Sequence, residues 1–398
     1  MNIVLHMGDP YPNESPAAKR IQSFYEVLTK NGHHVTVMAP KYGKADSNRC
    51  DVVYCPTIKM RKKSTLMRFL NQISFALSSV ICSRKAGKAD VVLTTSPPVL
   101  ISMAGWLIAK MKRAKLVYDV RDIWPDVALE MGSFTEKSFF CKVFAFIRNF
   151  MLKHSSLITA VSPGKVSKLK GYAPEAKVAY VTNGLDERFL ENTYHAQIAK
   201  EYGLDKGFNC VYIGNLGWAQ GLMQMLQLAE RAKEYNMDAR FILFGSGVEE
   251  ASLRTYAEER KLDNVVFAGR IPNVEMFTIL KSAQLSFVSL VNENLKDSVP
   301  TKMFEALGVG CPLLLVAVGD SVNILKECKL GIAVPPNQNE ALWEAFLELY
   351  NNMETYLAYR DHAHEVILNQ YSRQKAALTL EEHLEALLVS EISHSDLS

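Results

Sequence analysis

The chain has 398 residues, which is enough for two globular domains of ordinary size. Its apolar content of 48% predicts full hydrophobic cores, and its seven cysteines include no C-x-x-C pair, which argues against a disulfide framework or a zinc site. The net charge of +3 conceals an asymmetry, because residues 1–185 carry 27 Lys and Arg against 12 Asp and Glu, whereas the rest carries 18 against 30. The first half therefore predicts an anionic partner, either a membrane surface or a nucleic acid.

The first residues, 1–6, are typical of a buried strand rather than of a signal peptide, since they lack a basic head and a cleavage site. No uninterrupted apolar run reaches the ~18 residues that a bilayer span requires. The longest run, 99–109, is expected to be a core helix. Together with the scattered cysteines, these features predict a cytoplasmic protein.

Short β-rich runs alternate with helical stretches along the first half of the chain. The expected strands are 3–6, 33–39, 52–55, 91–95, 116–118, 157–160 and 178–181. A polar turn and a helix ending at Asn31 follow the first of them. This alternation predicts a doubly wound parallel sheet.

The second half repeats the pattern and ends in one more helix. The expected strands are 210–213, 241–244, 265–267, 285–288, 313–318 and 332–334. We therefore expect an α/β protein with two Rossmann-like domains, 1–185 and 186–370, followed by a helix at 371–390. Two such sheets facing each other would form a ligand-binding cleft between their carboxyl ends.

One helix start in the second half has the composition of an anion-binding site. Asp297 and Ser298 are suitable N-cap residues, and Pro300 suits a first helical turn. Free backbone N–H groups at such a start attract phosphate, and Lys302 adds a positive charge. Glu305 lies one turn further, where it can accept a hydrogen bond from a sugar hydroxyl. A capped helix before a strand is also an ordinary feature of α/β proteins, so this pattern alone does not establish a nucleotide site.

This stretch resembles the E-x7-E region of family-4 retaining glycosyltransferases, with Asp297 and Glu305 at the two acidic positions. Residues 181–186 resemble the P-N-G-V-D link of that family, and residues 118–126 resemble the D-x-R-D-L-W-P signature of bacterial enzymes that build surface polysaccharides. The resemblance extends over roughly residues 1 to 385. It implies the GT-B fold, with the final helix crossing back onto the first domain.

The resemblance also implies roles on the donor side. Glu305 would hold the ribose of a nucleoside diphosphate sugar, Lys302 and neighbouring backbone N–H groups the diphosphate, and Asp297 the transferred sugar. Strand-end turns would line the nucleobase pocket. The remaining expected donor-binding residues are Ser298, Val299, Pro300, Thr301, Asn215, Gln220, Gly245, Arg270 and Ile271.

The turn at 214–221 departs from the family pattern, because it lacks the Arg and Lys that family members place there. Asn215 and Gln220 can donate hydrogen bonds, but they carry no charge. Lys302 would then neutralise more of the diphosphate, together with Arg270.

In the first domain, Asp119 and Asp122 take the place of the His-Asp pair of many relatives. Either carboxylate would bind a sugar hydroxyl or accept the proton of the acceptor, with Arg121 and Asn13 on the acceptor side. The alternative is a buried Asp–Arg pair that only holds the loop.

The loop after the first strand carries Gly8 but lacks the paired glycines of relatives. Lys19 and Arg20, at the start of the next helix, could help to bind the donor phosphates instead. The alternative is a surface turn with a solvated helix start.

No D-x-D sequence is present, and no His cluster accompanies Asp119 and Asp122. The helix start and Lys302 can stabilise a departing diphosphate, so we expect neither a metal nor another cofactor. Walker A and G-x-S-x-G sequences are also missing, which argues against a P-loop NTPase and an α/β-hydrolase.

Two stretches of the basic half, 66–81 and 138–153, are amphipathic, and the basic cluster 59–63 precedes the first. Such helices suit an anionic leaflet, although both can also pack on their own sheet. They predict peripheral association with the inner face of the cell membrane. That location fits a polyprenyl-diphosphate-linked saccharide as acceptor, which the resemblance suggests.

Taken together, these features predict a retaining, metal-independent glycosyltransferase of surface polysaccharide synthesis, with no nucleic-acid partner. Resemblance alone favours UDP with an N-acetylated deoxyhexose over GDP with fucose. Two alternatives remain open: a sugar-nucleotide 2-epimerase on the same fold, and a non-catalytic membrane-docking subunit with a decayed nucleotide site.

Overall fold

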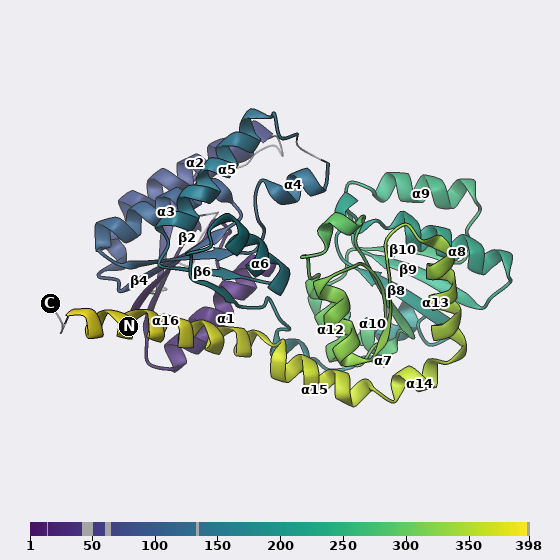
Figure 1. Ribbon diagram of the computed structural model, residues 1–398. Helices are drawn as coiled ribbons and strands as arrows, with labels where there is room; N and C mark the ends of the chain where they lie inside the picture. The colour runs from purple at the N-terminus through teal and green to yellow at the C-terminus, as the bar shows by residue number, and fades with distance from the viewer. Residues whose placement is uncertain (14, 42–50, 60–64, 133–134, 396–398) are drawn as a thin grey trace. The chain divides into compact units, whose positions relative to one another are not determined.

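The computed structural model describes residues 1–13, 15–41, 51–59, 65–132 and 135–395 (Figure 1). The chain divides into two compact units: unit 1 is Met1–Asn183 with the chain from Arg373 onward, and unit 2 is Gly184–Ser372. The boundary expected at residue 185 lies two residues from this division. The last helix, α16 (Arg373–Ser395), belongs to unit 1, as the resemblance implied.

Unit 1 contains a parallel sheet of seven strands in the order β3-β2-β1-β4-β5-β6-β7. All seven strands expected from the sequence are present, shifted by at most two residues at either end. Their bounds are β1 (Asn2–His6), β2 (His34–Lys41), β3 (Val52–Pro56), β4 (Val91–Ser96), β5 (Lys115–Val120), β6 (Leu157–Ala160) and β7 (Val178–Tyr180). Each residue of β4 is buried, as expected for a parallel strand that is covered on both faces.

Helices cover both faces of this sheet. Their bounds are α1 (Pro16–Lys30), α2 (Thr65–Cys82), α3 (Val99–Lys112), α4 (Asp126–Glu130), α5 (Phe139–His154) and α6 (Pro163–Tyr172), with a 3-10 turn η1 (Ser83–Ala86) after α2. Helices α1 and α16 pack on one face, and α2, α3 and α5 pack on the other (Figure 1). Alternate side chains of β1 enter the two cores: Ile3 and Leu5 point toward α1 and α16, and Val4 points toward the opposite layer.

In the described residues, one segment, Leu66–Ala86, is long and apolar enough to cross a bilayer by length and composition. The sequence analysis predicted no such segment, because polar residues interrupt every apolar run. In the structure α2 packs against β3 and α3, and its Phe75 and Ser79 are buried. One side of the helix is therefore part of the core of unit 1, as the packing alternative anticipated.

Unit 2 contains a second parallel sheet, with six strands in the order β10-β9-β8-β11-β12-β13. Its six strands match the expected ones within two residues. Their bounds are β8 (Phe208–Ile213), β9 (Ala239–Phe244), β10 (Val265–Gly269), β11 (Leu285–Ser289), β12 (Leu313–Val316) and β13 (Gly331–Val334).

The helices of unit 2 separate these strands and close the unit. Their bounds are α7 (Ala196–Glu201), α8 (Met223–Glu234), α9 (Glu250–Glu259), α10 (Asn273–Ser282), α11 (Thr301–Gly308), α12 (Asp320–Cys328), α13 (Asn339–Asn351), α14 (Met353–Leu357) and α15 (Arg360–Gln370). Three 3-10 turns complete the unit: η2 (Glu187–Phe189), η3 (Trp218–Gln220) and η4 (Glu293–Leu295).

Candidate functional site

The candidate donor site lies at the carboxyl edge of the sheet of unit 2. The strand order reverses between β8 and β11, and ligands of open α/β sheets bind where such a reversal opens a crevice. The turn after β8 begins at Gly214, and the segment after β11 leads to Lys302 in α11. The expected donor residues on these two segments therefore come to one place.

Glycines let the turns after β8 and β9 pack against each other. Gly214 N donates to Phe244 O at 2.9 Å, and Leu216 N donates to Ser246 O at 3.1 Å. A Cβ on Gly245 would lie 1.7 Å from Gly214 O, and the φ angle of Gly245 is 143°. No side chain fits there, so Gly245 holds two backbone segments in contact.

Lys302 reaches from α11 to the turn after β8. Its Nζ donates to the Tyr212 hydroxyl at 2.7 Å and to Gln220 Oε1 at 2.6 Å, and it lies 4.1 Å from the centre of the Tyr212 ring. A Cβ on Gly214 would lie 2.9 Å from this Nζ. The ammonium group is thus held directly beneath the glycine turn, where the family pattern expects a cation. Gln220, expected to donate to the diphosphate, accepts from Lys302 through its side-chain oxygen.

Burial lowers the pKa of Lys302 to about 7, although the charge of Glu305 opposes the shift. Near neutral pH the group is therefore close to its protonation midpoint. An anion that enters beside it would favour the charged form. Tyr212, which the sequence analysis missed because it occupies a buried strand position, also has a raised pKa, owing to burial and then to the charge of Glu249.

The start of α11 differs from its sequence prediction. The N-cap residue is Pro300 and makes no side-chain cap bond, so the prediction that Asp297 and Ser298 cap this helix is wrong. The proline side chain fixes the φ angle of residue 300 and has no acceptor atom, so the N-cap residue itself does not satisfy the first backbone donors of α11. Asp297 is buried, whereas Val299 and Thr301 are partly exposed.

Arg270 and Ile271 follow β10, next to the turn after β9. Arg270 Nε donates to Ser246 Oγ at 2.5 Å, so this exposed guanidinium is tethered to the glycine turn rather than free in solvent. Glu249, another residue that the sequence analysis missed, has a buried Oε2 with no hydrogen-bond partner among the described residues, and burial raises its pKa. The sequence offered one signal for Glu249 as a site residue: it is a charged residue that follows shortly after a glycine turn.

In unit 1 Asp119 pairs with Arg20, and both side chains are buried. Arg20 donates to the two carboxylate oxygens at 3.2 and 2.8 Å, and Thr159 Oγ1 donates to Oδ1 at 2.7 Å. Burial would raise the pKa of Asp119, but the charge and hydrogen bonds of Arg20, with the bond from Thr159, hold it below its usual range. Arg20 also donates to Val181 O at 3.0 Å, and so ties β5 to the end of β7.

This geometry is the buried Asp–Arg alternative, with Arg20 as the partner. Arg20, expected as a possible contact for the donor phosphates, is fully engaged inside unit 1 instead. Gly8 is also accounted for by packing, because a Cβ there would lie 2.8 Å from both Pro98 and Ile101.

The more accessible groups at this edge are Asp122, Arg121 and Asp9, all partly exposed, with Asn13 fully exposed. Arg121 donates from Nη2 to Pro97 O, and its buried Nε has no hydrogen-bond partner among the described residues. Burial raises the pKa of Asp9, and the nearby charge of Arg121 opposes this shift. Asp9 was missed by the sequence analysis, although its place just after the first strand was a usable signal.

Neither group of residues has the geometry of a metal site. Over residues 1–395 as far as they are described, one grouping does: His33, Glu381 and Glu385, where α16 packs on α1. His33 Nε2 and Glu381 Oε1 lie 2.8 Å apart, and Asn31 Nδ2 donates to Glu381 Oε2 at 2.6 Å. These contacts explain the cluster as an anchor for α16.

Comparisons with known proteins agree with the two-unit division. Residues 17–184 match the family model "Glycosyl transferase 4-like domain", and residues 196–366 match "Glycosyl transferases group 1". The chain belongs to the family-4 glycosyltransferases. The alternatives of an epimerase and of a non-catalytic subunit are not favoured by this assignment.

The names of two curated relatives refer to bacterial polysaccharides. The glycosyltransferase is 26% identical over 371 residues to the putative colanic acid biosynthesis glycosyl transferase WcaI of Escherichia coli K12, covering 86% of this chain and 90% of that protein. It is 25% identical over 228 residues to O-antigen chain mannosyltransferase C of Escherichia coli, covering 56% of this chain but only 58% of that protein.

Solved structures show the same fold. Sucrose-phosphate synthase from Thermosynechococcus elongatus superposes with a TM-score of 0.81 at 16% identity, covering 98% of this glycosyltransferase and 100% of that chain. Anabaena Alr3699/HepE, solved in complex with UDP-glucose, gives a TM-score of 0.73 at 12% identity over 96% and 99% of the two chains. The GT-B fold expected from the sequence is therefore confirmed.

The Arg20–Asp119 pair predicts a large loss of stability on Asp119→Asn. Removing one member of a buried ion pair leaves the other charge unsatisfied and costs about 3–5 kcal/mol, measurable by urea unfolding at neutral pH. Because the pKa of Asp119 is depressed, this difference should persist down to about pH 4 and shrink as the pH falls further. The matched variant Asp122→Asn should unfold like the wild type. Equal stability of the two variants would contradict a structural role for Asp119.

The contact between the glycine turns predicts that Gly245→Ala is destabilising by about 1–3 kcal/mol, because its Cβ has no space and its φ disfavours L-residues. Gly171→Ala is the matched control, since a Cβ at Gly171 would meet nothing within 4 Å. Thermal unfolding of both variants tests this, and a neutral Gly245→Ala would show that the turns are not packed as described.

Proposed function

We propose that this glycosyltransferase moves a sugar from a nucleoside diphosphate to a hydroxyl group of a lipid-linked saccharide in bacterial surface polysaccharide synthesis. The observation that carries the proposal is the Lys302 ammonium group, held beneath Gly214 by Tyr212 and Gln220 at the carboxyl edge of the sheet. The names of the curated relatives support polysaccharide synthesis, and the UDP-glucose complex of HepE supports a UDP donor.

The diphosphate would lie between the start of α11 and the turn after β8. Lys302 supplies the charge, and the backbone N–H groups of Val299, Thr301 and Lys302, with the amide of Asn215, supply hydrogen bonds. Glu305, one turn into the helix, would accept from the ribose. Gly245, Arg270 and Ile271 would border the nucleobase, and Asp297 would contact the donor sugar.

On the acceptor side, we assign the working carboxylate to Asp122. Asp119 has both oxygens occupied within the protein, whereas Asp122 follows it on the same edge and is partly exposed. Arg121 and Asn13 would orient the acceptor saccharide, and Asp9 joins them because its charge lies near Arg121.

In the proposed retaining reaction, the acceptor oxygen bonds to the anomeric carbon on the face from which the diphosphate departs. The breaking C–O bond leaves its electron pair on the phosphate oxygen, and the acceptor proton passes to that departing phosphate. Lys302 and the helix start stabilise the charge that develops there, which is the task a metal ion would otherwise perform. We therefore propose a metal-independent transfer, with a UDP-linked N-acetylated deoxyhexose as the first donor to test.

We further propose that the protein works at the inner face of the cell membrane. Helices α2 and α5 expose large apolar side chains, among them Leu66, Ile81, Phe139 and Phe146. Basic residues accompany them, including Arg68 and Lys142; residues 60–63 of the expected basic cluster lie outside the described residues. A surface of this kind suits an anionic leaflet that carries the lipid-linked acceptor.

Calorimetric titration with UDP and GDP tests the proposal directly. We expect UDP to bind, and Lys302→Met to weaken binding by about 10- to 100-fold, the value of a lost charge-assisted hydrogen bond. The control Lys296→Met removes an exposed lysine of the same segment and should bind as the wild type does. A screen of donor sugars with membrane extract, in which Glu305→Ala abolishes transfer, then identifies the substrate. If neither nucleotide binds, or if Glu305→Ala transfers normally, the proposed site is wrong.

The pKa of Lys302 predicts that UDP binding depends on pH. Above pH 7 the free protein carries a neutral Lys302, so an arriving diphosphate must draw in a proton. The dissociation constant should rise by up to about tenfold for each pH unit above 7, and calorimetry in buffers of different ionisation enthalpy should show proton uptake. Lys302→Arg, which stays charged, should flatten this dependence. An unchanged slope in that variant would show that another group titrates.

A further inference from the structure

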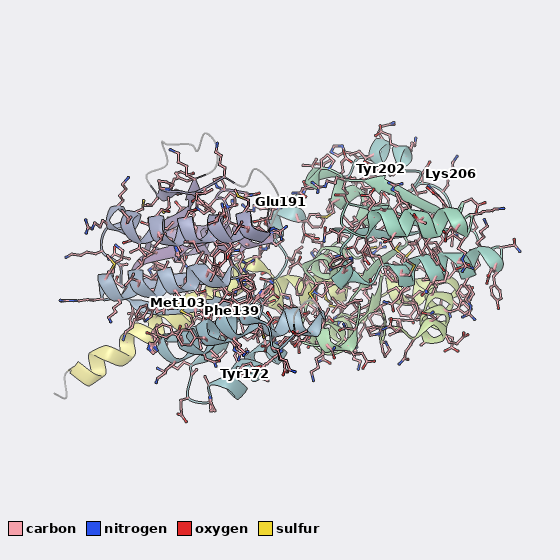
Figure 2. The ribbon with its side chains drawn as sticks, turned by 90° about the horizontal axis from the view of Figure 1, so that it is seen from above. Met103, Phe139, Tyr172, Glu191, Tyr202 and Lys206 are labelled. Carbon is pink, nitrogen blue, oxygen red and sulfur yellow. The ribbon has the colours of Figure 1, made fainter. Side chains whose placement is uncertain are left out.

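The layer of α2, α3 and α5 forms one continuous surface on unit 1, which we call the docking face. The three helices pack side by side, α2 on α3 and α3 on α5. Figure 2 looks down on this layer and labels Phe139 of α5 and Met103 of α3. Its exposed large apolar residues are Leu66, Phe69, Leu70, Leu77 and Ile81 on α2, Leu107 and Met111 on α3, and Phe139, Phe140 and Phe146 on α5.

The Lys and Arg residues of the three helices are Arg68, Lys110, Lys112, Lys142, Arg148 and Lys153. None of the three helices carries an Asp or Glu. A layer of helices that exposes apolar side chains and whose Lys and Arg residues are matched by no Asp or Glu on the same helices is complementary to an anionic phospholipid bilayer.

A chain of aromatic rings connects the docking face to the segment after β5. Phe139 is 74% exposed, and its ring centre lies 6.0 Å from that of Phe140. Phe140 lies 6.3 Å from Phe144, which meets Trp124 edge-on at 5.7 Å with an angle of 88°. Trp124 is two residues from Asp122, so four rings connect the outermost side chain of α5 with the acceptor-side carboxylate.

Polar contacts strengthen the same connection. Asp126, the first residue of α4, accepts from Arg148 of α5 at 2.6 Å and from the Tyr172 hydroxyl at 2.7 Å. Arg148 also lies over the Tyr172 ring, with its Cζ atom 3.6 Å from the centroid. The short helix α4 is therefore held by α5 and α6. The residues between Arg121 and the start of α4 are in this way connected to α5.

We propose that Phe144 and Trp124 are positioning residues, through which docking of α5 on an anionic bilayer orders the Asp122 segment of the acceptor site. This inference rests on the proposed function, because it concerns an acceptor that is presented by a membrane. In solution the outer rings of α5 have no partner layer on their exposed side. When these rings insert into a leaflet, their motion is restricted. This restriction is transmitted to α4 through the ring contacts and the Arg148–Asp126 pair.

Amide hydrogen exchange of the full chain tests this coupling without a substrate. The reporters are the amides of Val127, Ala128 and Leu129, which donate to Ile123 O and Pro125 O. On vesicles of equal parts phosphatidylglycerol and phosphatidylcholine, we expect their exchange to slow by about threefold or more. Vesicles of phosphatidylcholine alone should leave it unchanged.

Variants on the two sides of the Phe144–Trp124 contact separate coupling from folding. Phe144→Leu should still bind the mixed vesicles but lose the slowing, and Trp124→Leu should do the same from the other side of the contact. Phe150→Leu is the matched control, because Phe150 packs on Trp106 with centroids 5.0 Å apart, rather than on Trp124. It should retain the slowing.

Each remaining outcome overturns one part of the inference. If the protein does not bind the mixed vesicles, the proposal that the docking face binds an anionic bilayer is wrong. Binding without slower exchange, or slowing that persists in Phe144→Leu and Trp124→Leu, removes the coupling. Neither result bears on the donor site, which UDP calorimetry tests separately.

Discussion

A single ammonium group organises the carboxyl edge of unit 2. The side chain of Lys302 extends from α11 over the Tyr212 ring and donates to the Tyr212 hydroxyl and Gln220. Burying a charge is costly, and these two partners offset only part of that cost, because burial still lowers the pKa of Lys302 to about 7. The absence of a side chain at Gly214 leaves room for the group, and a methyl there would lie against it. The residues Gly214 and Gln220 of the turn after β8 therefore both serve the placement of this group.

The same arrangement explains the departure from the family pattern. Where relatives carry Arg and Lys near this turn, this chain has Gln220, whose oxygen binds a lysine that arrives from a different element. The positive charge at this turn comes from α11 and not from the turn itself. Because Lys302 has a lowered pKa, the site holds less charge when empty than when an anion is bound, which reduces the cost of keeping a cation buried.

Unit 1 uses the two faces of its sheet differently. Helices α1 and α16 close one face with a shared apolar core, and Glu381 of α16 bonds to Asn31 and His33 at the end of α1. The opposite layer keeps apolar side chains on its outer side. Between the two layers, the Arg20–Asp119 pair holds the strands at the edge where Asp122 emerges. A buried charge pair in this position fixes geometry, whereas the neighbouring carboxylate of Asp122 is partly exposed.

The sequence by itself determined the thirteen strands, the two parallel sheets and the segments that carry the donor site, because buried parallel strands are short apolar runs and the turns that follow them share one edge. It also indicated Lys302 and Glu305, since a helix start has a recognisable composition. Tertiary structure alone decided which charged side chains are engaged inside the protein. Asp119 and Asp122 are both acidic residues in one short segment, and only the position of Arg20, 99 residues away, distinguishes them. Likewise Pro300, and not Asp297, is the N-cap residue of α11, and the side-chain oxygen of Gln220 accepts from Lys302. Pairings between distant residues depend on how strands and helices are placed in space, and no local pattern of residues records that placement.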